Sequence, residues 1–115
     1  MKKIVSLDKD SQYRKIYRKG RSSVQPSLVI YAKENGLDIN RLGITASKKI
    51  GKAVVRNRCK RRLRELYRSY QESLNTGFDI ILVARGKTFF ASAPVLKSAF
   101  EKGAMYVGLL SATEK

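Results

Sequence analysis

The stretch VRNRCKRRLRELYRSY, residues 55–70, carries the pattern that decides the fold. If each residue turns by about 100°, the apolar side chains fall on one arc, which comprises Val55, Cys59, Leu63, Leu66, Tyr67 and Tyr70. Opposite that arc lie Asn57, Lys60, Arg61, Arg64 and Arg68, and at its two edges lie Arg56, Arg58 and Arg62. The pattern predicts an amphipathic helix that ends near the stop residues Asn75 and Gly77.

Positive charge is concentrated on this helix and just before it. The 115-residue chain has 25 Lys and Arg against 9 Asp and Glu, a net charge of +16, and residues 48–68 hold ten of these cations and a single acid. Ordinary solvated helix faces mix the two signs, whereas Lys60, Arg64 and Arg68 repeat one sign at i, i+4, which costs stability. Arginines outnumber lysines six to one from Val55 to Arg68, and the planar guanidinium suits phosphate and base contacts. The outer face therefore predicts binding to nucleic acid, with RNA favoured.

The sequence before this helix predicts one helix and three strands. Residues 8–19 place apolar and aromatic side chains at helical spacing, and Gly20 is a typical stop. A short strand should precede Pro26 and a longer one should follow it at residues 28–32. Residues 42–46 alternate between large apolar and small or polar side chains, so that with the turn at 34–36 these two strands read as a β-hairpin.

The sequence after the basic helix predicts one more strand and one more helix. Residues 79–85 are apolar throughout their centre, as in a strand covered on both faces. After a polar loop, Ser92 should cap a last helix with Pro94 in its first turn. Its buried side should comprise Leu96, Ala99, Phe100, Gly103 and Val107, and residues 111–115 should fray. The order is α-β-β-β-α-β-α, a single α+β domain, residues 1–115, with helices packed on a four-stranded sheet.

A second candidate surface is aromatic. Tyr13 and Tyr17 on the first helix and Tyr31 on a central strand are placed to line a groove between that helix and the sheet, although they could equally be core residues. Basic residues interleave with them, as in a stacking platform beside a phosphate track that would hold a single RNA strand. Three phenylalanines, Phe89, Phe90 and Phe100, are expected to be packing residues, and Cys59 a small core residue.

The sequence gives little support to a catalytic, secreted or membrane protein. The chain has no histidine, its acids are scattered, and its glycines form no phosphate-binding loop, so no catalytic residue is expected. A single cysteine fits a reducing cytoplasm, and the chain has neither a secretory signal nor an apolar run of the roughly 20 residues that a membrane span needs. We expect a cytoplasmic protein that binds neither membrane nor DNA.

The segment SKKIGKAVVRNRCKRRLRE, residues 47–65, closely resembles the protein component of bacterial ribonuclease P. The resemblance extends over YRKIYRKG (13–20), LVIYA (28–32), RLGITASKK (41–49) and DIILVAR (79–85). It implies a left-handed β-α-β crossover around the basic helix, similar to the ribosomal protein S5 domain 2-like fold. It also implies that the chain is the RNA-binding subunit of a ribonucleoprotein endonuclease that processes tRNA. In that family the RNA subunit holds Mg²⁺ and hydrolyses precursor tRNA to release the 5′ leader.

The resemblance also assigns roles to individual residues. It implies contacts with the catalytic RNA by Lys49, Lys52, Arg56, Asn57, Arg58, Lys60, Arg61, Arg64 and Arg68, and a leader-binding cleft formed by Tyr13, Tyr17 and Tyr31. Tyr13 stands where the family more often has Phe, and Cys59 where it has a larger aliphatic residue. The segment after Lys87 matches weakly and receives no role. A small ribosomal or assembly protein is the main alternative, followed by a stand-alone nuclease and a helix-turn-helix DNA-binding protein.

Overall fold

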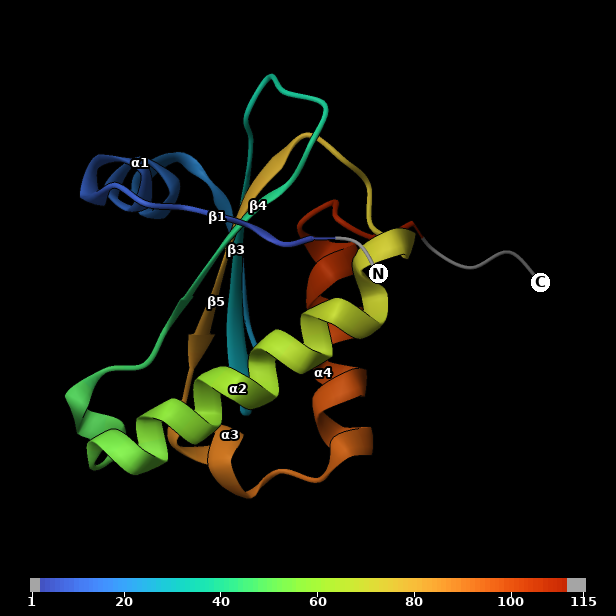
Figure 1. The fold of residues 1–115 in the computed structure, drawn as a ribbon. Helices are drawn as coiled ribbons and strands as arrows, with labels where there is room; N and C mark the ends of the chain where they lie inside the picture. Colours follow the sequence, from blue (N-terminus) through green and yellow to red (C-terminus); the bar gives the residue numbers. More distant parts are fainter. Residues whose placement is uncertain (1–2, 112–115) are drawn as a thin grey trace.

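The computed structural model describes residues 3–111, which form a mixed five-stranded sheet with helices on both faces. The elements are β1 (Val5–Ser6), α1 (Asp10–Lys19), β2 (Arg21–Val24), β3 (Leu28–Glu34), β4 (Arg41–Thr45), α2 (Ala53–Tyr70), β5 (Phe78–Ala84), α3 (Gly86–Phe90) and α4 (Ala93–Tyr106) (Figure 1). Short 3₁₀ turns, Lys48–Ile50 and Gln71–Ser73, flank α2. The sheet order is β1-β4-β5-β3-β2; β4 runs parallel to β1 and β5, and β3 runs antiparallel to β2 and β5. The expected α+β class is confirmed.

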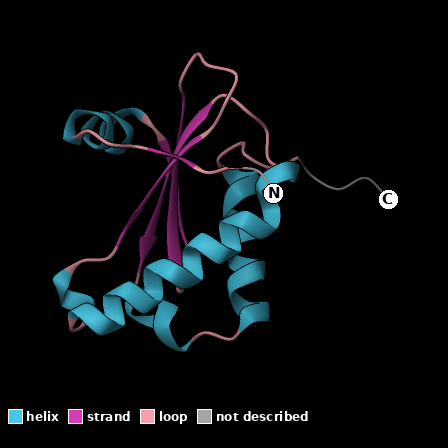
Figure 2. Cartoon of the chain, in the orientation of Figure 1, coloured by secondary structure: helices cyan, strands magenta, loops and turns pink. Residues whose placement is uncertain are grey.

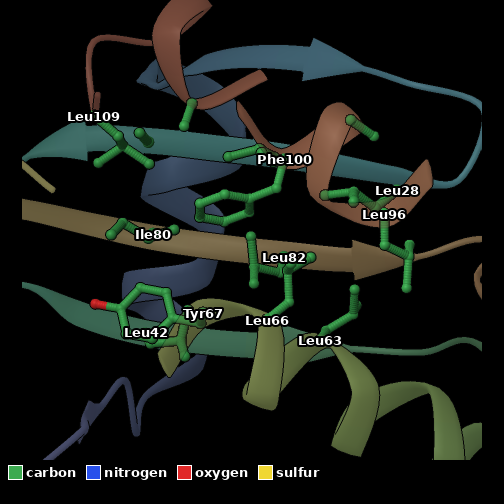
Figure 3. Close-up of a cluster of buried hydrophobic side chains, with 14 of the residues drawn as sticks. Leu28, Leu42, Leu63, Leu66, Tyr67, Ile80, Leu82, Leu96, Phe100 and Leu109 are labelled. Atoms are coloured by element: carbon green, nitrogen blue, oxygen red, sulfur yellow. The ribbon is translucent and has the colours of Figure 1, made fainter. Parts of the chain in front are cut away.

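One face of the sheet packs against α2 and α4 and holds the main core. Figure 3 shows Leu63 and Leu66 of α2 and Phe100 of α4 converging on Ile80 and Leu82 of the central strand β5. The buried side predicted for α4 is confirmed, and its Ser92 cap accepts a hydrogen bond from the N–H of Val95. The arc predicted for α2 is also confirmed, with Cys59, Leu63, Leu66 and Tyr67 buried and Val55 and Tyr70 partly buried.

The opposite face of the sheet is covered at one end by α1 (Figure 2). Ile16 of α1 is buried against Leu7 and Ile81, in a second, smaller cluster. The strand β5 is therefore apolar on both faces where α1 covers it, as its sequence predicts. Within residues 3–111 no helix combines the length and the apolar composition that a membrane span requires.

Two expectations about the sheet are wrong. The sheet has a fifth strand, β1. The sequence did not predict it because two residues are too few to give an alternating pattern. The strands β3 and β4 do not form a hairpin, because β5 lies between them and pairs with both. The segment between β3 and β4 is hydrogen-bonded to the start of β5 instead. The N–H of Asn35 donates to the carbonyl of Gly77, and the side chain of Asn40 accepts from the N–H of Phe78.

The helix boundaries also differ in part from the expected ones. The polar loop expected after β5 contains the short helix α3, in which the buried Thr88 accepts a hydrogen bond at Oγ1 from the N–H of Arg85. The basic helix starts two residues earlier than Val55 and gives way to a 3₁₀ turn after Tyr70. Of the C-terminal residues expected to fray, 112–115 lie outside the described residues.

A partly buried ion pair fixes the start of β5 against β4. Asp79 accepts hydrogen bonds from Nε and Nη2 of Arg41, both at 2.8 Å, and from Nδ2 of Asn35 at 3.0 Å. Burial alone would raise the pKa of the Asp79 carboxyl, but these hydrogen bonds outweigh burial and hold its pKa below the ordinary value. The charges of Arg41 and Asp79 therefore neutralise each other within the fold.

We expect Asp79→Asn to destabilise the protein by about 1–3 kcal/mol at pH 7, because the Arg41 guanidinium loses a charged partner. The pKa of Asp79 is lower in the folded than in the unfolded chain, so its contribution is complete above about pH 5 and disappears as the pH falls through the folded value. Urea unfolding from pH 7 to pH 2.5 should show the difference between the two proteins shrink as the pH falls below about 4.

The exposed Asp38→Asn is the matched control, with wild-type stability at every pH. A difference between Asp79→Asn and wild type that persists unchanged at low pH would contradict this account.

Candidate nucleic-acid interface

The outer face of α2 displays an array of exposed cations. Asn57, Arg58, Arg61, Arg64 and Arg68 are exposed, Lys60 is partly buried, and Lys49 and Lys52 are exposed in the segment before the helix. Apart from Arg68, none of the cations directly opposite the buried arc has an ion-pair or hydrogen-bond partner for its side chain among the described residues. The buried arc holds this face in one fixed orientation relative to the sheet. The structure therefore brings the predicted outer-face residues together on one surface.

The segment that leads into α2 extends this surface to the N-terminus of the helix. Nη1 of Arg56 donates a hydrogen bond of 3.0 Å to the carbonyl of Gly51, which holds the loop against the first turn of the helix. The N-cap residue is Lys52, and its side chain makes no capping hydrogen bond. The partial positive charge at the helix N-terminus adds to the lysine charges, so this end of α2 favours an anion such as phosphate.

The arginines at the edges of the arc act partly within the protein. Nη1 of Arg62 donates to the carbonyls of Thr88 at 2.8 Å and Phe89 at 3.3 Å, so Arg62 ties α2 to α3. The guanidinium of Arg58 lies over the ring of Phe89, with its carbon 5.8 Å from the ring centroid. The sequence placed both arginines at the edge of the helix but gave no sign of these contacts, because α3 itself was not predicted.

The three predicted tyrosines lie together on the face of the sheet that α1 covers. The rings of Tyr17 and Tyr31 meet edge to face with centroids 4.8 Å apart, and Tyr17 is 42% exposed. Tyr13 packs over Gly43 so closely that a Cβ on that glycine would lie 2.7 Å from Cζ of the ring. Burial raises the pKa of Tyr13, with smaller contributions from Tyr17 and Asp10. Tyr17 and Tyr31 are therefore the rings best placed to meet a ligand.

The same face of the sheet continues beyond the tyrosines into a hollow of about 490 Å³. It is lined by Val24, Val29, Ser47, Lys49, Ile50, Val83, Ala84, Arg85 and Gly86. The hollow joins the basic segment before α2 to the open end of the sheet, since Lys49 lies in both. Sequence reasoning missed these lining residues, although the alternating burial of β3 would have placed Val29 on the same face as Tyr31.

The described residues contain no group of three or more His, Cys, Asp or Glu side chains that could hold a metal ion. Cys59 is buried in the core, and burial raises the pKa of its thiol.

These features define a class of small, strongly basic α+β proteins that carry more than half of their net charge on one helix and the segment leading into it. The family model described as Ribonuclease P matches residues 1–106. The chain is 44% identical over 114 residues to the ribonuclease P protein component of a Thermoanaerobacter species, covering 99% of this chain and 98% of the relative. It is 46% identical over 99 residues to that of Alkaliphilus oremlandii, covering 86% and 87% of the two chains.

Solved structures agree with these relatives. The ribonuclease P protein of Staphylococcus aureus superposes with a TM-score of 0.81 at 30% identity, covering 95% of this chain and 100% of that one. The chain therefore belongs to the ribonuclease P protein family. Membership gives it a role in tRNA 5′ processing within a ribonuclease P complex, with ribonuclease P RNA as the implied partner. The ribosomal or assembly protein considered from the sequence is set aside by this assignment.

We expect Gly43→Ala to destabilise the protein by about 1–3 kcal/mol, because the added methyl group collides with the Tyr13 ring. Removing the ring should relieve the collision, so in urea unfolding Gly43→Ala should cost less in a Tyr13→Ala background than in wild type. Gly86→Ala is the control, because nothing lies within 4 Å of a Cβ at that position. Additive effects of Gly43→Ala and Tyr13→Ala would show that the ring does not rest on Gly43.

Proposed function

We propose that this protein is the RNA-binding subunit of ribonuclease P and assists a catalytic RNA in removing the 5′ leader from precursor tRNA. The outer face of α2 and the segment before it bind the catalytic RNA, through the residues from Lys49 to Arg68 on that face. The groove formed by Tyr13, Tyr17 and Tyr31 binds the leader. The chain thus serves the endonuclease as a subunit, and hydrolysis belongs to the RNA.

The observation that carries the proposal is the dense positive charge on the outer face of α2. Repulsion between like charges one helical turn apart costs stability, and within residues 3–111 no acidic side chain forms an ion pair with Lys60, Arg61 or Arg64. A polyphosphate ligand removes this repulsion on binding and releases its own counterions to the solvent. The charge is therefore better explained by a ligand than by the stability of the free protein.

The groove suits a single strand better than a duplex. Tyr17 and Tyr31 offer ring surface at which an unstacked base can be placed, and basic residues of α1 flank them. A leader is single-stranded, so its bases are free to stack without the cost of opening a helix. The three tyrosines lie on the face of the sheet opposite the one that α2 packs against, which supports separate sites for the two RNA ligands.

Magnesium belongs to the RNA subunit in this proposal. The described residues offer no carboxylate cluster that fits the ion, so none of them is assigned to it. The protein's part is to place charge and aromatic rings beside the two RNAs. The proposal locates this work in the cytoplasm.

The direct test is to add the protein to a ribonuclease P RNA subunit at low magnesium and follow 5′ maturation of a precursor tRNA. We expect clear stimulation, since bound cations offset phosphate repulsion that magnesium otherwise screens. The absence of any stimulation, with folded protein and active RNA, would refute the proposed function.

We further expect mutations in the two surfaces to weaken the binding of different RNAs. Arg61→Ala with Arg64→Ala should weaken binding to the RNA subunit and reduce the slope of log K against log salt by roughly 0.7–0.9 for each lost phosphate contact. Tyr17→Ala should weaken binding of the holoenzyme to precursor tRNA by about 1–3 kcal/mol, and leave binding to mature tRNA unchanged.

Each change has a matched control. Lys9→Ala with Lys97→Ala removes the same charge from exposed positions outside α2, and Tyr106→Ala removes an aromatic ring that is 64% exposed on α4. Equal effects of the α2 variant and its charge control would show that only net charge matters. Equal effects of Tyr17→Ala on the binding of precursor and mature tRNA would contradict the proposal that the tyrosines bind the leader.

A further inference from the structure

Phe90 projects into solvent at the end of α3, where the sequence led us to expect a packing residue. Its side chain is 83% exposed, more than any other large hydrophobic residue among those described. The exposure does not come from a loose helix: Arg62 donates to the carbonyls of Thr88 and Phe89, and Oγ1 of the buried Thr88 donates to the carbonyl of Ser27. The fold thus holds the Phe90 ring at the surface.

The ring borders an apolar hollow with a positive rim. The hollow has a volume of about 550 Å³, and Pro26, Phe90 and the half-exposed Val95 supply apolar surface to it. Lys87 and Lys102 are the charged residues that line it, and no acid does. An adjoining hollow shares Pro26, Lys87 and Phe90 with the first and adds Arg85. This combination of an exposed ring with cations lining the same hollows suits a nucleotide, whose base stacks while its phosphates meet the lysines.

A chain of ring contacts links Phe90 to the cationic face of α2. The Phe90 ring meets Phe89 edge to face with centroids 5.0 Å apart, and Phe89 in turn lies under the guanidinium of Arg58. The hollows that carry Phe90 also continue, through Arg85 and Ile50, into the one that contains Lys49. Both Arg58 and Lys49 belong to the surface that we assign to the catalytic RNA. The ring contacts through Phe89 to Arg58 therefore place Phe90 next to the surface that we assign to the catalytic RNA.

We propose that the Phe90 surface, made up of Phe90, Lys87, Lys102 and Arg85, binds an unpaired nucleotide of the ribonuclease P RNA subunit. The base stacks on the Phe90 ring, and Lys87 and Lys102 contact the adjacent phosphates. The inference rests on the proposed function and adds a contact from the C-terminal third of the chain. A second copy of this chain fits the surface less well, because the net charge of +16 repels another copy while it attracts RNA.

The test uses Phe90→Trp as a fluorescent reporter, because the chain has no tryptophan of its own. We expect the RNA subunit alone to quench the fluorescence of this variant, since stacking on a base changes the environment of the indole. Tyr106→Trp places the reporter at an exposed position on α4 and should respond much less.

Affinity measurements give an independent readout. Phe90→Ala should bind the RNA subunit about 5- to 150-fold more weakly, the range for losing one base–aromatic stack. Lys87→Ala with Lys102→Ala should lower the salt slope by roughly 1.4, for two phosphate contacts with a single strand. Since Phe90 is so exposed, its removal should leave urea unfolding unchanged.

The possible outcomes are distinct. Wild-type affinity of Phe90→Ala for the RNA subunit, together with an unquenched Phe90→Trp, would overturn the inference and leave the proposed function standing. Quenching that requires a precursor with a leader would overturn it in favour of the leader. A wild-type dimer that Phe90→Ala converts to a monomer would reassign the surface to self-association. Failure of the wild-type protein to bind the RNA subunit would instead contradict the proposed function.

Discussion

Burial of one narrow arc of α2 against the sheet is the interaction on which the rest of the structure depends. Leu63, Leu66 and Tyr67 are almost fully buried there, and each such side chain stabilises the fold by about 1.5–3 kcal/mol. Each like-charge pair one turn apart on the outer face costs only about 0.2–0.5 kcal/mol. The stabilisation from packing is therefore several times larger than the cost of charge repulsion. The helix can carry a dense cationic face and remain packed on the sheet.

Because of the sheet topology, the position of α2 gives the molecule two different surfaces. The strands β4 and β5 are parallel neighbours, and α2 is the crossover that joins them. With α4 beside it, α2 fills one face of the sheet, and α1 covers only one end of the other. On that second face Tyr31 of β3 meets Tyr17 of α1, and the hollow near Lys49 lies beyond them. A cationic helix face and a cluster of tyrosines on the opposite side of the sheet thus follow from the way three helices share a single sheet.

The sequence predicted those parts of the fold in which a regular pattern repeats over many residues. The arc of α2 repeats over about four turns, and α4 has both a capping serine and a regular apolar side, so the structure matches both. The pairing of β3 with β5 is a long-range choice that no local pattern encodes, and the turn near Gly36 suggested a hairpin that does not form. For the candidate site, the sequence supplied the outer cations and the three tyrosines. The roles of Arg62 and Phe90 depend on α3, whose five residues are too few to show a period.

The central claim is that the outer face of α2 and the groove beside Tyr31 meet different RNAs. Tethered cleavage tests it most directly: with Cys59 replaced by Ala, an iron-based cleaving group is attached to Arg61→Cys on α2 or to Ser22→Cys, which pairs with Tyr31 in the sheet. The account predicts that the probe at position 61 cuts the catalytic RNA and that the probe at position 22 cuts the leader of a bound precursor tRNA. Cleavage of the same RNA from both positions, or the reverse assignment, would contradict it.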